Sequence, residues 1–297
     1  MPESLCLRPV DVFDERALAD YHRVHQRALG HGRPRFTPTE LTGLATTLRT
    51  PSDRIERAVV GAYDGPRGPL LGACVTILPL LDNLDQAWVY PFVDPAVRRR
   101  GVGSALAAHA LAQIGARGRR TVLAEIELDG APSADKAAAT PEFAFARRWG
   151  FAIGQRSVRR ELALPADPSR LAALDAWASR GAAYRIETHP GLPPEADVPA
   201  LAELMGLVQV DAPSGEVDFE PEVFTPQGLH TLWTARLDAG IGERPVHETL
   251  RENLQPRLHP IRSIRLTPAD RVRLEPRSRV GGDDAPGIHD HPHMTSA

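Results

Sequence analysis

VDPAVRRRGVGSAL, residues 93–106, places an arginine- and glycine-rich loop between two apolar segments. The preceding QAWVYPFV at 86–93 reads as a buried strand. The following segment has apolar residues at helical spacing, namely Leu106, Ala110, Leu111 and Ile114. Gly101 and Gly103 let the backbone adopt positive φ and approach a ligand closely. Free N–H groups at a helix start, with arginines beside them, suit a pyrophosphate.

The loop lacks residues that two common pyrophosphate-binding patterns require. The dinucleotide-binding pattern needs a third glycine where this chain has Leu106. The nucleoside-triphosphate loop needs a Gly-Lys-Ser/Thr step, and the loop has no lysine. Both classes are therefore disfavoured. A solvated arginine-rich turn that caps a helix is the alternative reading of the same residues.

The pattern Arg98-x-x-Gly101-x-Gly103 resembles the coenzyme A signature of the GNAT (Gcn5-related) N-acetyltransferases. FAFARRWGF at 143–151 resembles that family's helix ending in an aromatic Gly-Phe step. The order of expected elements over 4–164 is also similar. The resemblance implies an α/β (α+β) GNAT fold: a mixed central sheet with helices on both faces.

Local patterns predict the elements of this first domain one by one. Asp14 can cap a helix that buries Leu18, Tyr21, Val24 and Ala28 and stops at Gly30, and Thr140-Pro141 opens a later helix. We expect strands at 4–12, 57–63, 70–78, 86–93, 121–127, 151–153 and 157–164, and a further helix at 38–49.

The second half of the chain is less complete. Residues 165–182 read as a linker with a helix, and 183–240 repeat the opening of the first domain before the pattern fails. This indicates an incomplete second GNAT-like module, as in a shortened tandem-GNAT protein similar to mycothiol synthase. Residues 241–297 are rich in Pro, Arg and His and predict a disordered tail. His289, His291 and His293 lie there without a framework for a metal.

The resemblance also implies roles for individual residues. The backbone amides of the loop would hold the pyrophosphate of acetyl-CoA: Arg99, Arg100, Gly101, Val102, Gly103 and Ser104. Arg98 would shape the loop, and the main chains of Phe92 and Val93 would pair with the pantetheine arm as an added strand does. Acceptor specificity in this fold would lie in the 30–50 region and the 128–140 loop.

The expected catalytic positions depart from the family's pattern. Ala87 stands where members often have a glutamate base, and Ala146 where they often have a tyrosine acid. The nearest substitutes are Glu125, Glu127 and Tyr90, although the glutamates can equally be solvated strand residues and Tyr90 a core residue.

These observations predict an acetyl-CoA-dependent N-acetyltransferase, without a metal, that acts on a primary amine of a small molecule or of a peptide or protein. The alternative is a coenzyme A-binding domain that senses or stabilises without turnover. A net charge of −3 over 297 residues gives no support to a nucleic-acid or membrane partner. We expect a cytoplasmic protein without leader or membrane span, with Cys6 and Cys74 as core thiols. A homodimer is left open.

Overall fold

The computed structural model describes residues 5–128, 133–157, 165–178, 185–188, 191–211, 215–241 and 262–265. Contacts divide the chain into two units. The first is drawn from 1–162 and 189–260, and the second from 163–188 and 261–297. The first unit carries the sheet and the arginine–glycine loop.

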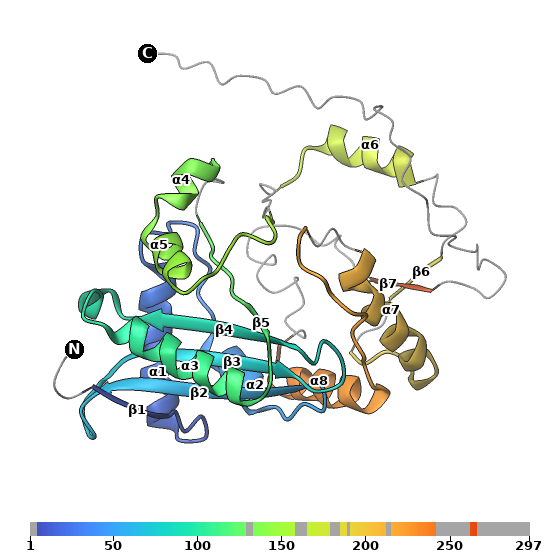
Figure 1. Ribbon diagram of the computed structural model, residues 1–297. Helices are drawn as coiled ribbons and strands as arrows, with labels where there is room; N and C mark the ends of the chain where they lie inside the picture. The colour runs from blue at the N-terminus through green and yellow to red at the C-terminus, as the bar shows by residue number, and fades with distance from the viewer. Residues whose placement is uncertain are drawn as a thin grey trace, which may run out of the picture. The chain divides into compact units, whose positions relative to one another are not determined.

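A five-stranded sheet forms the centre of the first unit (Figure 1). Its order follows the sequence: β1 (Leu5–Pro9), β2 (Ile55–Asp64), β3 (Leu70–Pro79), β4 (Gln86–Val93) and β5 (Thr121–Leu123). The first four strands pair antiparallel, and β4 pairs parallel with β5. The sheet is therefore mixed, as the sequence predicts.

One face of the sheet is covered by α1 (Glu15–Gly30) and α2 (Leu41–Arg49). The α1 helix buries the four residues predicted for it, Leu18, Tyr21, Val24 and Ala28. Asp14 caps it by accepting a hydrogen bond from the Ala17 N–H at 2.7 Å. Burial of this apolar stripe fixes α1 against β3 and β4.

The opposite face of the sheet is covered by α3 (Val102–Ala116), so helices lie on both faces as expected. The α3 residues in this second core are Val102, Leu106, Ala110 and Ile114. They pack against β4 through Ala87 and Val89. Alternation along β4 therefore assigns its odd residues to the α3 face and its even residues to the α1 face.

The chain after α3 differs from the prediction. β5 ends at Leu123, and residues 124–128 have no regular structure, although a strand was expected to 127. A short α4 (Ala134–Ala138) precedes α5 (Pro141–Arg148), which Thr140 caps as predicted. The strand expected at 151–153 is wrong, because 151–157 has no regular structure. Most of the strand expected at 157–164 lies outside the described residues.

Part of the second half of the chain packs with the first unit. Its elements are η3 (Glu195–Asp197), α7 (Val198–Asp211) and α8 (Pro226–Asp238). Val198, Ala202 and Leu229 form a small core of their own. Thr225 caps α8 by accepting from the Gly228 N–H at 2.9 Å. The α7 and α8 helices correspond to the helices expected within 183–240, whereas the assignment of that segment to a second module stays a prediction.

The second unit contains α6 (Pro168–Ala178) and a two-stranded ladder. In that ladder β6 (Arg185–Thr188) pairs antiparallel with β7 (Arg262–Arg265). β7 falls within 241–297, where a tail without structure was expected, so the chain differs from that expectation at these four residues. Apart from Ile241 and β7, that segment lies outside the described residues, and so do His289, His291 and His293.

Candidate functional site

The N-terminus of α3 is open toward solvent at the arginine–glycine loop. Gly101 occupies the N-cap with φ 84°, a conformation that glycine adopts without strain and that supplies no capping side chain. The first bond of the helix runs from the Ala105 N–H to the Gly101 carbonyl at 3.0 Å. The N–H groups of Val102, Gly103 and Ser104 precede that bond and point out of the helix end. This is the arrangement that binds a phosphate group.

The three arginines of the loop have different environments. The Arg98 guanidinium donates to the Ala28 carbonyl at 3.0 Å and to the Val93 carbonyl at 3.4 Å. It therefore ties the loop to α1 and β4, which agrees with a shaping role. Arg99 has φ 66°, and both Arg99 and Arg100 are exposed. Their charges are the ones available to an anion at the helix end.

β4 and β5 separate after the pair formed by Trp88 and Leu123. Their parallel pairing ends at Trp88 and Leu123, whereas β4 continues to Val93. The Thr121 N–H donates to the Asp85 carbonyl at 3.0 Å on the β5 side. The Asp94 N–H donates to the Leu71 carbonyl at 2.9 Å on the β3 side. Main-chain groups alternate between the two sides of a strand, so an edge of β4 lies open beyond Trp88.

The alternation of β4 corrects one predicted ligand contact. Val89, Pro91 and Val93 turn their main-chain groups to the open edge, and Phe92 turns its own to β3. The main-chain groups of Val93 face that edge, and its pairing with an extended ligand stays a prediction. Phe92 is not, and its side chain is buried in the α1 core.

Pro91 was overlooked in the sequence, although a signal was present. Proline inside a strand cannot donate to a ladder and is found where its nitrogen faces an unpaired edge. Pro91 therefore marks the edge that β5 leaves. It offers an extended ligand its carbonyl but no N–H.

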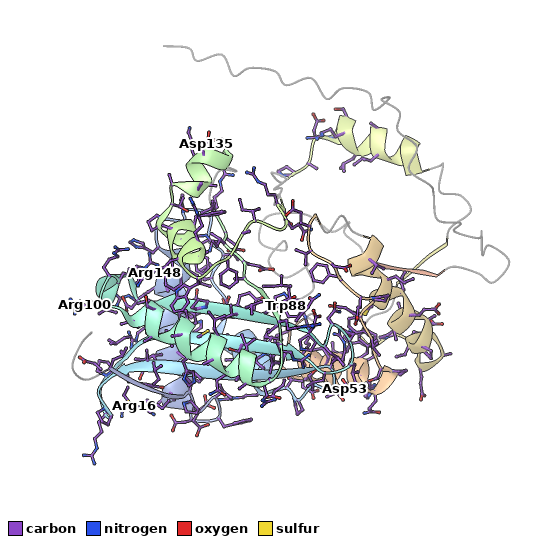
Figure 2. The ribbon with its side chains drawn as sticks, in the orientation of Figure 1. Arg16, Asp53, Trp88, Arg100, Asp135 and Arg148 are labelled. Atoms are coloured by element: carbon purple, nitrogen blue, oxygen red, sulfur yellow. The ribbon has the colours of Figure 1, made fainter. Side chains whose placement is uncertain are left out.

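A cavity of about 310 Å³ lies between α3 and the end of α5. It is lined by Ser104, Ala105 and Ala108 from α3 and by Arg148 and Trp149. The Trp149 Nε1 donor is buried without a hydrogen-bond partner among the described residues. Figure 2 marks Arg148 here and Arg100 in the loop. A cation and an indole ring make the cavity suited to a ligand with rings and oxygen atoms.

The three predicted catalytic residues come near the α1 face of the sheet. Burial raises the pKa of Tyr90 to about 12, and the nearby Glu125 charge adds to that rise. Tyr90 is therefore protonated at neutral pH and is a weaker acid than an ordinary tyrosine. Glu127 forms an ion pair with Arg33, which follows α1. That pairing holds Glu127, whereas Glu125 is exposed beside Tyr90.

The two alanines lie apart from these substitutes. Ala87 is fully buried against α3, on the face of β4 opposite Tyr90. Ala146 lies on α5. Proton transfer by Tyr90 or Glu125 would thus act from the α1 face and not from the position of Ala87.

His25 of α1 was also overlooked, because a single histidine at a helical position carries no distinguishing signal. Its ring stacks on Tyr21 at a centroid distance of 5.9 Å and meets Phe92 edge-on at 5.1 Å. Burial lowers the pKa of His25 to about 4, with the neighbouring His22 as a second cause. His25 is therefore a half-buried neutral imidazole at neutral pH, packed on Tyr21 and Phe92.

The described residues were compared with the requirements of a metal site and of a membrane-spanning helix. Within them, no three His, Cys, Asp or Glu side chains gather closely enough to hold a metal ion. None of the described helices is both long and apolar enough to span a bilayer. Cys6 and Cys74 are free thiols, with Cys74 buried as expected and Cys6 half-buried.

The mixed sheet, the open β4 edge and the uncapped α3 loop define the GNAT fold, which this chain has. A solved structure described as a tandem GNAT protein from the clavulanic acid biosynthesis pathway aligns with a TM-score of 0.52 and 21% identity. The alignment covers 80% of this chain and 67% of that one, so the likeness extends past the first module.

Two single-module structures align over about half of this chain. An acetyltransferase from Trypanosoma brucei is 22% identical, with a TM-score of 0.36, and covers 54% of this chain and 100% of its own. An aminoglycoside acetyltransferase from an uncultured soil metagenomic sample is 16% identical, with a TM-score of 0.37, and covers 54% and 96%. These two likenesses are too loose to carry an argument. No family model and no curated protein matches the sequence.

Proposed function

We propose that this protein is an acyltransferase that moves an acetyl group from acetyl-CoA directly to a primary amine of a small molecule, or of a peptide or protein, in the cytoplasm. The observation that carries the proposal is the uncapped N-terminus of α3 immediately after the open edge of β4. An anion site and a vacant strand position in line suit a ligand with a pyrophosphate and an extended amide arm.

Acetyl-CoA would be held mainly by main-chain groups. The amides from Arg99 to Ser104 surround the position of the pyrophosphate, and the exposed Arg99 and Arg100 neutralise its charge. The pantetheine arm would pair with the main chain of Val93. Pro91 has no N–H to donate to the arm, but its carbonyl can accept a hydrogen bond from an amide of the arm. The cavity beside Arg148 and Trp149 offers room for a further part of the cosubstrate.

Acetyl transfer needs a neutral amine and a proton for the leaving sulfur. The amine nitrogen attacks the thioester carbonyl, so a C–N bond forms and the C–S bond breaks. Glu125 takes the proton that the nitrogen loses, and the Tyr90 hydroxyl gives a proton to the thiolate. The Tyr90 hydroxyl is protonated at neutral pH, although its raised pKa makes it a weaker acid than an ordinary tyrosine.

A coenzyme A-binding domain without turnover is the second candidate. It is favoured by the apolar surroundings of Ala87, by the pairing of Glu127 with Arg33, and by the donor that Pro91 removes from the open edge. Each of these lowers the number of groups that can polarise the thioester or move a proton.

Calorimetric titration with acetyl-CoA, followed by detection of free thiol with a panel of amines, separates the two candidates. Binding with amine-dependent thiol release supports the transferase. Binding without release for every amine supports the second candidate. If acetyl-CoA does not bind, both are wrong.

A further inference from the structure

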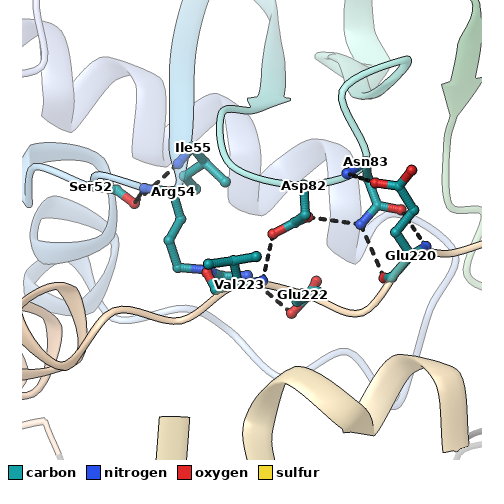
Figure 3. A network of polar contacts seen from close by, with 8 residues as sticks. All are labelled: Ser52, Arg54, Ile55, Asp82, Asn83, Glu220, Glu222 and Val223. Atoms are coloured by element: carbon teal, nitrogen blue, oxygen red, sulfur yellow. Dashed lines mark hydrogen bonds and ion pairs between the residues drawn. The ribbon is translucent and has the colours of Figure 1, made fainter. Parts of the chain in front are cut away.

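Residues 216–225, here called the strap, lie along the end of the sheet where β4 begins. The Asn83 side-chain amide donates to the Glu220 carbonyl at 3.3 Å, and its oxygen accepts from the Glu220 N–H at 2.9 Å. The Asn83 N–H donates to the Glu220 carboxylate at 2.8 Å. The Asp82 carboxylate accepts from the Val223 N–H at 2.7 Å (Figure 3). The turn before β4 therefore recognises the backbone of the strap.

Further contacts hold both ends of the strap. The Glu216 N–H donates to the Gly154 carbonyl at 2.8 Å, and Thr225 bonds the Asp53 carboxylate. Arg54 pairs with Glu222 at 3.1 Å and lies over the Phe224 ring at 3.5 Å. The strap is thus fixed in register along its length.

The burial of polar residues in the first module shows how completely the strap is seated. Asp82, Asn83 and Gln86 are 8%, 1% and 4% exposed. Each bonds the strap, Gln86 by donating to the Asp218 carbonyl at 2.6 Å. Buried polar groups need partners, and the strap supplies one to each of these three side chains, although the Gln86 side-chain oxygen has no partner among the described residues.

The register of the strap brings Phe219 onto Trp88. The two rings are nearly parallel, 9° apart, with centroids separated by 6.5 Å. Trp88, marked in Figure 2, is the last β4 residue paired with β5, so the ring pair stands where the open edge begins. Both rings are half-buried and keep exposed surface.

The ring pair and the candidate proton-transfer groups share one face of β4. Trp88 and Tyr90 are two residues apart, which places them about 7 Å from each other along the strand. The Glu125 charge also acts on Tyr90. An aromatic surface is thus followed, one side-chain step toward the open edge, by a hydroxyl in the field of a carboxylate.

Building on the proposed function, we propose that Phe219, from the second half of the chain, is a specificity-determining residue that binds the acceptor, and that with Trp88 it selects amines carrying a flat ring. The ring of the acceptor packs on the exposed surface of the pair, and its amine reaches Tyr90 and Glu125. A short two-carbon linker between ring and amine suits the spacing along β4. Arylalkylamines are the substrate class that fits.

The test compares phenethylamine with ethanolamine as acceptors, with thiol release as the readout. Replacing Phe219→Leu keeps an apolar side chain and removes the ring. We expect KM for phenethylamine to rise roughly 10-fold, because a stacked aromatic contact is lost. The change in kcat/KM should be much smaller for ethanolamine, which has no ring to pack, so the preference for phenethylamine should fall. Phe219→Tyr keeps the ring and should retain the wild-type KM.

Phe224→Leu is the matched control, since Phe224 belongs to the same strap but packs on Arg54. It should leave both amines unaffected. Equal KM values for phenethylamine in Phe219→Leu and wild type would overturn the inference and leave the proposed function intact. Failure of Phe219→Leu and Trp88→Leu to fold would show a structural ring pair, which also overturns it. Absence of thiol release by the wild type with every amine would instead remove the proposed function itself.

Discussion

Asn83→Ala is expected to destabilise the whole first unit and not only a surface loop. The Asn83 side chain makes three hydrogen bonds: one to Asp82 at 2.7 Å and two to the Glu220 main chain at 2.9 and 3.3 Å. Each buried bond contributes roughly 0.5–1.5 kcal/mol. Asn83 also has φ 43°, which alanine adopts at a cost of roughly 1 kcal/mol. Together these give a loss of roughly 2.5–5.5 kcal/mol in the free energy of unfolding.

Asn83→Gly separates the two contributions. Glycine loses the same bonds but accepts the positive φ, so it should be more stable than the alanine variant by roughly 1 kcal/mol. Urea unfolding of the full chain, followed by tryptophan fluorescence, measures both variants. Limited proteolysis should cut the strap earlier in each variant than in wild type. A loss below roughly 1 kcal/mol in both would refute the docking of the strap through Asn83.

Three further changes test the site and the α1 core. Gly103→Asp should abolish acetyl-CoA binding in calorimetry, because it places a carboxylate where a phosphate is expected to bind. Gly103→Ala should leave the fold intact, since its Cβ would meet Val93 and Phe145 at ordinary distances of 3.5 and 3.6 Å. Unchanged affinity in the aspartate variant would contradict the loop assignment. Glu125→Gln should lower turnover roughly 10²–10⁴-fold with nearly constant acetyl-CoA affinity, and unchanged turnover would show that Glu125 is not the base. The pKa of His25 is about 4 in the folded protein against an ordinary 6.5, so the unfolded chain takes up the proton first as pH falls. The free energy of unfolding should therefore drop by roughly 1–3 kcal/mol between those two pH values. The urea midpoint of His25→Phe should lack that part of the pH dependence, and an equal pH dependence in variant and wild type would argue against a neutral buried ring.

Much of the first module follows from local sequence patterns. The four-residue apolar stripe and the Asp14 cap predict α1, and Thr140-Pro141 predicts the start of α5. These signals work because caps and apolar periodicity act within one or two turns of a helix. The glycines of the loop likewise predict an open helix end, because that geometry depends on the local backbone.

The ends of strands and the acceptor side were less predictable. β5 stops at Leu123 because its pairing with β4 stops there, and nothing within 121–127 encodes where a neighbouring strand diverges. The assignment of Phe92 failed for a related reason, since only the register with β3 fixes which main-chain groups face the open edge.

The sequence by itself determined the order of the first helices and strands and the arginine–glycine loop at the start of α3, and it placed alanines at positions 87 and 146. Only the tertiary structure decided that residues 216–225 close over the start of β4 and bring Phe219 onto Trp88. Asn83 and Glu220 are separated by 137 positions. Contacts of that range depend on how two distant segments pack, because each segment alone would satisfy its polar groups with water.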